Sequence, residues 1–306
     1  RSVWTRRGRF DTTVAMTKLS EPQLEQARLA AAELNDALKP LRMLSSIAWP
    51  HSFRDRFIKD GVLPSPSYTH IDVTHSLDAV TSARSRIDGD HVVFAWLRRQ
   101  ADTVETMAHM LSARGTKVFS FHSQALFGQP SRLMLDGKTR VIDLARHMDE
   151  ALADLDVSKL VIEGYETFMD AEVFAKKFRP QLKKHLGASA PKVVLTDEIT
   201  AKAVAGSTRI RLRRSAQFSN RDLEQLLQHE ALVHVATALN GKAQDNFPIL
   251  GRAHAGTTEI QEGLAVFAEL MSGAMDPVRF RRLADRVIAI QMSLDGADFV
   301  DVYTYY

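Results

Sequence analysis

The chain of 306 residues has 45% hydrophobic residues, 25% charged residues and a net charge of +3, which is typical of a globular protein with one large domain or two modest ones. It contains no cysteine, which excludes a disulfide framework, a thiolate metal ligand and a thiolate nucleophile. No apolar run is long enough to span a bilayer, and the first residues lack the apolar core of a secretory signal, so we expect a cytoplasmic protein.

The first half of the chain is predicted to be mainly helical, after a flexible arm at residues 1–18. Ser20 caps the first helix, Pro22 lies in its first turn, and Pro40 ends or bends it. The segment TKVFSF at residues 116–121 is a candidate strand. A loop is predicted at residues 61–69, and further helices are predicted at residues 77–87, 100–114, 140–155 and 168–186.

The second half mixes strands with helices. Residues 192–198, KVVLTDE, are predicted to form a strand. Residues 208–214, TRIRLRR, alternate apolar and basic side chains, as an edge strand would. Ser219 or Asn220 then caps a helix that begins near Arg221.

These elements predict an α+β fold in which a small sheet lies beside that helix. The chain divides, at a soft boundary within residues 155–190, into a mainly helical region at residues 19–155 and a mixed region at residues 156–306. The two regions form either separate domains or one compact unit.

Ionisable residues interrupt the apolar stripe of the helix that begins near Arg221. At steps of three and four residues, the stripe consists of Leu223, Leu226, Leu227, Glu230 and His234. A helix that buries this face must satisfy its ionisable groups. A bound cation would satisfy His229 and His234 and keep the Glu230 carboxylate ionised, so the pattern suggests a metal site.

The spacing of these histidines is unusual for such a site. Residues four apart on an α-helix differ in direction by about 40°, but residues five apart differ by about 140°. On a regular helix His229 and His234 could therefore not share one metal ion. A π-bulge would absorb one extra residue, and such bulges are frequent at functional sites. We predict a bulge within Ala231 to Val233.

Spacing alone leaves the metal site open, because a chance match is the alternative. His70 and His75, in THIDVTH, are also five residues apart, but no glutamate follows the first of them. We interpret this second pair as surface or capping histidines, since short motifs often match by chance.

A third ligand is needed, because hydrolytic zinc sites use three protein ligands and keep one position open. The segment AGTTEIQEGLAVFAELMSG, residues 255–273, is predicted to form a helix with a capping box between Thr258 and Gln261 and a stop at Gly273. Glu262 would lie in its first turn, where the helix dipole favours the charged carboxylate. The alternative is that Glu259 and Glu262 are only stabilising first-turn acids.

Two blocks together resemble a known family. QHEALVHVATALNGKAQ, followed by TTEIQEGLAVFAEL, is similar to the QEGLA-motif family, also described as flavohaemoglobin expression-modulating proteins. That family is related to the microtubule-associated tyrosine carboxypeptidases, which share the His-Glu-x-x-x-His and Glu-Gly-Leu-Ala blocks. The segments AGSTRIRLRR and DGADFVDVYTYY also resemble it. The resemblance covers residues 20–306.

The resemblance implies a zincin-like metallopeptidase that binds Zn²⁺ through His229, His234 and Glu262. It also implies that Glu230 is the general base. The residues themselves give Glu230 the same role, because a carboxylate beside a metal can accept the proton of a water acidified by that metal. The family continues beyond Tyr306, so we expect either that part of the site wall is missing or that the sequence is truncated. No clear tubulin-binding extension is visible, unless the short Arg-rich arm counts.

Four further residues are candidates for substrate binding. A peptidase needs an oxyanion donor, and a carboxypeptidase also needs a cation for the terminal carboxylate. Arg209 and Arg211 could supply the cation. Alternatively, their charges could only keep a solvated strand edge from pairing with another chain. His254 and Tyr303 could donate to the oxyanion, or they could be an ordinary loop histidine and core tyrosine. Asn240-Gly241 is predicted to end the active helix.

We therefore expect a zinc-dependent metallopeptidase whose substrate is a peptide or a protein C-terminus, with carboxypeptidase action as one form of this activity. The alternative is a non-catalytic metal-binding regulator that retains the peptidase fold. Nucleic acid is a less favoured partner, because most of the basic excess lies in the first ten residues. No membrane partner is expected.

Overall fold

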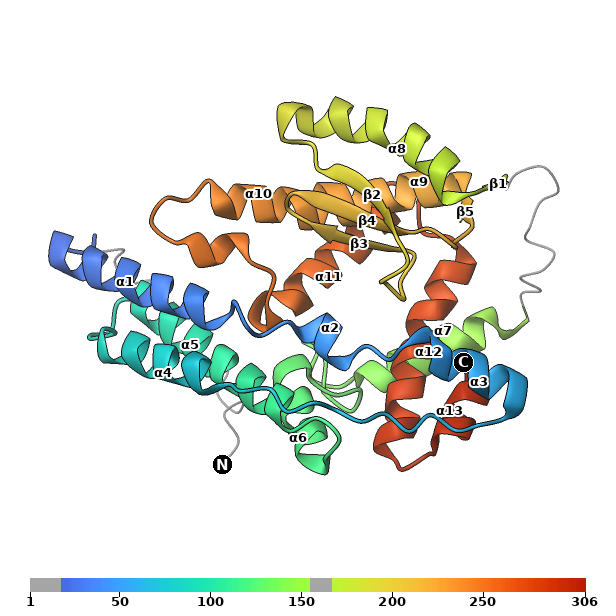
Figure 1. Cartoon of the computed structure of the whole chain (residues 1–306), viewed down its shortest axis with the longest axis horizontal. Helices are drawn as coiled ribbons and strands as arrows, with labels where there is room; N and C mark the ends of the chain where they lie inside the picture. Colours follow the sequence, from blue (N-terminus) through green and yellow to red (C-terminus); the bar gives the residue numbers. More distant parts are fainter. Residues whose placement is uncertain (1–17, 155–166) are drawn as a thin grey trace.

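The computed structural model describes residues 18–154 and 167–306. It is mainly helical with two small sheets, so the α+β expectation is confirmed (Figure 1). The predicted arm lies outside the described residues, except for Lys18. Within the described residues, no helix has the length and apolar character needed to cross a bilayer.

Seven helices precede the second undescribed segment, within the part of the chain that the structure covers. They are α1 (Glu21–Ala37), α2 (Met43–Ile47), α3 (His51–Asp60), α4 (Thr74–Ser85), α5 (Val92–Ser112), α6 (Lys117–Phe127) and α7 (Val141–Ala153). The predicted cap of α1 is confirmed. Ser20 and Gln23 form a capping box, in which each side chain bonds the other residue's backbone N–H.

Two expectations for this half were wrong. The candidate strand at residues 116–121 is part of helix α6, because packing against α5 overrides the strand preference of Val118, Phe119 and Phe121. Helix α5 begins at Val92, eight residues before the predicted start. His91 caps it by accepting a hydrogen bond from the N–H of Val93 at 3.2 Å.

The second half contains the sheets and the longest helical run. Its elements are β1 (Phe168–Met169), α8 (Ala171–Leu186), η1 (Gly187–Ser189), β2 (Lys192–Thr196), β3 (Ala203–Gly206), β4 (Arg209–Arg213), β5 (Phe218–Ser219), α9 (Asn220–Leu226), η2 (Leu227–Val235), α10 (Ala236–Lys242), η3 (Pro248–Gly251), α11 (Ala255–Met271), α12 (Pro277–Leu294) and α13 (Phe299–Tyr305). The helix predicted from residue 168 begins at Ala171, after the short strand β1.

The main sheet has the order β2-β4-β3, with β4 parallel to β2 and antiparallel to β3. Strand β4 is therefore central, and its prediction as an edge strand was wrong. Its alternation reflects one buried and one more accessible face, with Ile210 and Leu212 fully buried. The true edge beside the site is β3, whose sequence AVAG has only one residue, Val204, of the kind that usually marks a strand.

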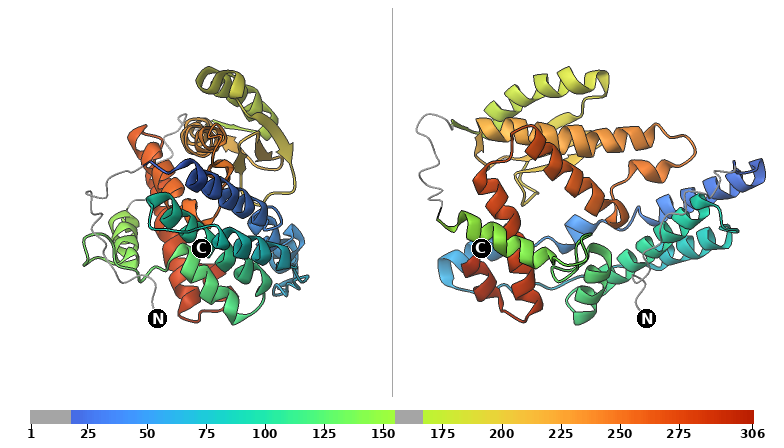
Figure 2. Two further views of the ribbon diagram at one scale, coloured as in Figure 1. Left: turned by 90° about the vertical axis from the view of Figure 1, so that its left-hand side faces the viewer. Right: turned by 180° about the vertical axis from the view of Figure 1, so that it is seen from behind.

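Two apolar cores support two layers of the molecule. One core lies among α1, α4 and α5 and includes Leu34, Phe94 and Leu97. The other joins α8 to the sheet and to η2, and includes Phe174 and Ile210. Both views in Figure 2 separate the layer of α8, the sheet and η2 from the layer of α1, α4 and α5.

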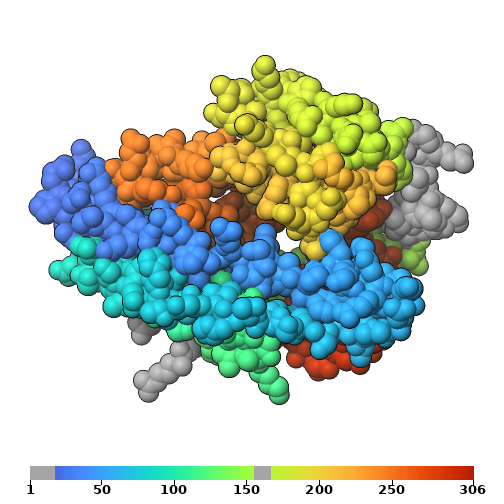
Figure 3. All heavy atoms as spheres, in the orientation of Figure 1, coloured from blue at the N-terminus to red at the C-terminus, as the bar shows by residue number. Residues whose placement is uncertain are grey.

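Helix α11 links the two layers. It packs against η2 in one layer and against α5 and α6 in the other. Figure 3 shows a hollow between the two layers, with the darker orange atoms of this part of the chain visible inside it. The residues that α11 contributes therefore lie near an accessible part of the molecule.

Candidate metal centre

The helix that carries the two histidines is locally widened. Its start is fixed by Ser219, which forms a capping box with Asp222 at the first turn of α9. The helix then changes to π geometry over the nine residues of η2 and returns to α geometry in α10. The predicted bulge within Ala231 to Val233 is confirmed, and the widened segment extends beyond it on both sides.

This widening brings the two imidazoles together. The ring centroids of His229 and His234 lie 4.9 Å apart, with an angle of 74° between the ring planes. On a regular α-helix the two directions would differ by about 140°. The π-helix therefore resolves the difficulty that the spacing of five residues poses.

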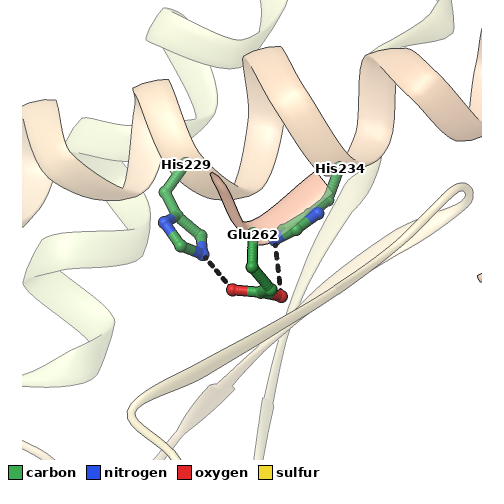
Figure 4. A group of neighbouring side chains, drawn as sticks. All are labelled: His229, His234 and Glu262. Atoms are coloured by element: carbon green, nitrogen blue, oxygen red, sulfur yellow. Dashed lines mark ion pairs between the residues drawn. The ribbon is translucent and has the colours of Figure 1, made fainter. Parts of the chain in front are cut away.

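Glu262 on α11 completes the cluster (Figure 4). Its Oε2 lies 3.5 Å from Nε2 of His229, and its Oε1 lies 3.4 Å from Nε2 of His234. Among the described residues, these three are the one group of histidines and acids placed so that they could hold a metal ion. Their ligand atoms all lie within 4.8 Å of one another. Two imidazole nitrogens and a carboxylate oxygen are a donor set that fits Zn²⁺. The side chains can therefore hold a metal ion.

The other ring nitrogens are already engaged, which leaves both Nε2 atoms for the centre. Nδ1 of His229 lies 2.6 Å from Oε1 of Glu269, and Nδ1 of His234 lies 3.2 Å from Oε1 of Gln261. Both partners come from α11, the helix that also carries Glu262. Metal-binding histidines commonly donate their second N–H to such an oxygen.

Glu269 is the most deeply buried charged group of the site, with 0% exposure. Burial alone would raise its pKa, but hydrogen bonds from His229 and Arg279 outweigh burial and hold the pKa at about 2. Burial also disfavours the charged form of His229. Hydrogen bonds to Glu262 and Glu269 outweigh that effect and raise the pKa of His229 to about 9.

Glu230 lies between the ligands and the sheet. Its Oε2 accepts a hydrogen bond of 3.1 Å from the backbone N–H of Ala205 on β3. Burial raises the pKa of Glu230, and the charges of His229 and His234 oppose that rise. The carboxylate is thus held beside both imidazoles by a strand that sequence reasoning did not identify.

A surface pocket of about 270 Å³ adjoins this strand. It is lined by Ala205 and Gly206 of β3 and by Arg209 and Arg211 of β4. Arg209 is exposed and Arg211 is half-buried. The structure therefore places these two predicted residues beside the strand that contacts Glu230.

The other two substrate-binding candidates lie elsewhere. His254 is buried and caps α11, where its Nδ1 accepts a hydrogen bond of 3.2 Å from the N–H of Gly256. Eight residues separate it from Glu262, a rise of about 12 Å along a helix. Tyr303 lies on α13, where its ring stacks with that of Phe299. The ring centroids of Tyr303 and Phe57 lie 4.8 Å apart in an edge-to-face contact.

Three local predictions need correction. The cap of α11 is His254 and not Thr258, because the helix begins at Ala255, four residues earlier than a cap at Thr258 implies. Glu262 therefore lies in the body of α11 and not in its first turn, and the stop at Gly273 follows the C-cap Ser272. Asn240-Gly241 does not end the active helix, which continues to Lys242. Gly241 is instead a point of close approach, where an added Cβ would lie 2.0 Å from the carbonyl oxygen of Leu250.

The interpretation of the second pair of histidines, His70 and His75, as surface residues is confirmed. His70 and His75 are both exposed, and Nε2 of His75 lies 2.9 Å from Oδ2 of Asp36.

Sequence reasoning missed Glu269 and Arg279. The available signal was the spacing of seven residues between Glu262 and Glu269, which places both on one face of α11. A second carboxylate on the face that meets the histidines is unexpected in a helix that packs there, unless it has a partner. Arg279 gave no comparable signal, because it comes from the next helix.

The fold and site define a mainly helical protein with a His₂Glu cluster suited to a metal ion and with a fourth ionisable residue, Glu230, beside it. The family model described as microtubule-associated tyrosine carboxypeptidase matches residues 52–306. The chain therefore belongs to this family, which points in general terms to peptidase activity of the carboxypeptidase kind. No curated protein and no solved structure matches the chain.

Proposed function

We propose that the protein is a zinc-dependent metallopeptidase with a zincin-like fold, acting as a carboxypeptidase. The observation that carries this proposal is the convergence of His229, His234 and Glu262, with ligand atoms within 4.8 Å of one another. Three protein ligands of this type leave an open position, as hydrolytic zinc sites require. The family description supports the carboxypeptidase assignment.

The chain's own residues account for the proton transfers. When bound, Zn²⁺ supplies a Lewis acid and makes water more acidic. Glu230 is close enough to His229 and His234 to interact with their charges. Its carboxylate accepts a proton from the attacking water as the water oxygen adds to the peptide carbonyl carbon. The same proton then passes to the amine nitrogen as the C–N bond breaks.

The outer edge of β3, the one that does not pair with β4, can align the substrate. The N–H of Ala205 points to Glu230 and not to β4, so this edge faces the site. An extended peptide that pairs with such an edge gains main-chain hydrogen bonds. Arg209 and Arg211, in the adjoining pocket, then provide cations for the terminal carboxylate.

The test compares wild type with Glu230→Gln on peptide libraries with free and with amidated C-termini. Zinc content is measured in both proteins. We expect equal zinc, a loss of roughly 10²- to 10⁴-fold in kcat for the variant, and no cleavage of amidated peptides.

Equal activity of the two proteins would reject the assigned role of Glu230. Cleavage of amidated peptides would indicate an endopeptidase. Retained zinc without turnover of any peptide would favour a regulatory protein that keeps the fold.

A further inference from the structure

We propose that Glu269 and Arg279 form a positioning pair, which orients His229 so that its Nε2 is the nitrogen presented to the cation. Neither residue is one of the three proposed ligands. The inference rests on the proposed function, since it concerns one of the ligands assigned there. It adds two residues and a third helix, α12, to the parts that determine the geometry of the centre.

The contacts of Glu269 use both of its oxygens. Oε1 lies 2.6 Å from Nδ1 of His229 and accepts a hydrogen bond of 3.0 Å from Nη2 of Arg279. Oε2 accepts a second hydrogen bond of 3.0 Å from Nε of Arg279. The guanidinium thus grips the carboxylate at two points, a geometry that fixes orientation as well as charge.

Burial makes this arrangement demanding. Glu269 is fully buried, and the side chain of Arg279 is 16% exposed. A buried carboxylate without a partner is strongly unfavourable, and Arg279 supplies that partner. Because an ionised carboxylate only accepts hydrogen bonds, Nδ1 of His229 must carry the proton in this contact. Loss of the other proton, from Nε2, on cation binding would leave the neutral imidazole with its lone pair on that atom, which faces Glu262.

Arg279 is itself held in place. Asp276 caps α12 and accepts a hydrogen bond of 2.7 Å from the N–H of Arg279. Oδ2 of Asp276 lies 3.0 Å from Nη1 of Arg221, a residue of α9. The chain of hydrogen bonds and ion pairs therefore starts at His229, crosses α11 and α12, and returns to the helix that leads into η2.

The same helix offers a matched control. Glu259 and Arg132 also form a two-point pair between a glutamate of α11 and an arginine of another segment. Their side chains are 66% and 48% exposed, and exposed pairs add little to stability. The partner of Glu259 is Arg132 and not a histidine of the centre, so this residue separates the effect of the buried contact from that of a charge on α11.

The experiment measures Zn²⁺ affinity by chelator competition for wild type, Glu269→Gln, Arg279→Lys and the control Glu259→Gln. Unfolding free energies are measured alongside, so that only folded protein is compared. We expect Glu269→Gln to weaken zinc binding roughly 10- to 100-fold, the usual effect of removing such a partner. Arg279→Lys keeps the charge but loses the two-point grip, so we expect a smaller loss in the same direction.

A second measurement distinguishes positioning from general support of the fold. The visible spectrum of the Co²⁺ form reports ligand geometry, and we expect it to change in Glu269→Gln and Arg279→Lys but not in Glu259→Gln. If Glu269→Gln does not fold, Arg279→Lys carries the test.

The outcomes separate this inference from the function on which it rests. A wild type that binds no zinc would overturn both. A wild type that binds zinc, with unchanged affinity and Co²⁺ spectra in both pair variants, would overturn the positioning role and leave the proposed metal centre intact. Lower stability with unchanged affinity would likewise assign the pair a purely structural role.

Discussion

The two layers of the molecule differ in whether they bury charged side chains. The core among α1, α4 and α5 is built from alanine, leucine, valine, methionine and phenylalanine, together with Ile249 of η3. The buried polar side chains of α4 and α5, Ser76 and Gln100, are uncharged. In the other layer, the apolar core beneath the sheet lies next to buried His229 and Glu269. The first arrangement gains stability from apolar burial, whereas the second must compensate buried charges with specific partners.

This difference teaches where stability and chemistry reside. Apolar burial is roughly proportional to area and tolerates changes of sequence that keep volume and pattern. A buried cluster of charges depends on each contact, because one missing partner leaves another group unsatisfied. We therefore expect substitutions in the helical core to change stability without changing the affinity for zinc, if the layers are energetically separate.

The largest expected effect on stability comes from Leu97→Ala in α5. Leu97 is fully buried, and truncating such a side chain lowers the free energy of unfolding by roughly 2–5 kcal/mol. Urea unfolding measures this loss, and chelator competition on the folded variant measures zinc affinity. A substantial fall in that affinity would break the comparison, because it would show that the helical core also determines the geometry of the site.

The next effect concerns His254, where α11 begins near α5. Burial lowers the pKa of His254 to about 4, and protonation at Nδ1 would remove the acceptor that caps Gly256. The unfolded chain has a histidine pKa of about 6.5. The contribution of neutral His254 is therefore fully present above that pH, and it is lost as pH falls toward 4.

The size of this loss is on the order of 3 kcal/mol. The measurement is urea unfolding of the metal-free protein at pH 8 and pH 4.5. His254→Asn is the control, since asparagine can cap a helix but does not titrate in this range. We expect wild type to lose more stability than the variant over this interval, and equal losses would contradict the assigned cause.

The sequence predicted the site better than its surroundings. The stripe that ends in His234 and the unusual spacing from His229 required a widened turn, and that turn is present. A regular helix would have separated the two rings, so the local pattern had few structural solutions. Glu262 could be assigned to a helix because its apolar pattern predicted one, although the start of that helix, and with it the first-turn position of Glu262, was wrong.

The rest depended on contacts that no local pattern encodes. Strand β3 exists because β4 pairs with it, although its residues other than Val204 have little preference for strands. Helix α6 forms where aromatic and β-branched residues suggested a strand, because α5 supplies a surface for it. Arg279 reaches the site from a separate helix, and such a long-range partner is visible only when the helices are assembled.

The smallest expected effect is that of Ser20→Ala at the start of α1. Ser20 and Gln23 form the capping box, and α1 then contributes Ala27, Ala31 and Leu34 to the helical core. Loss of such a cap lowers the free energy of unfolding by about 1 kcal/mol. Because the box is exposed and remote from the buried charges, zinc affinity should stay at the wild-type value. Urea unfolding and chelator competition measure the two quantities, and a changed affinity would mean that even the entry of the first helix influences the metal centre.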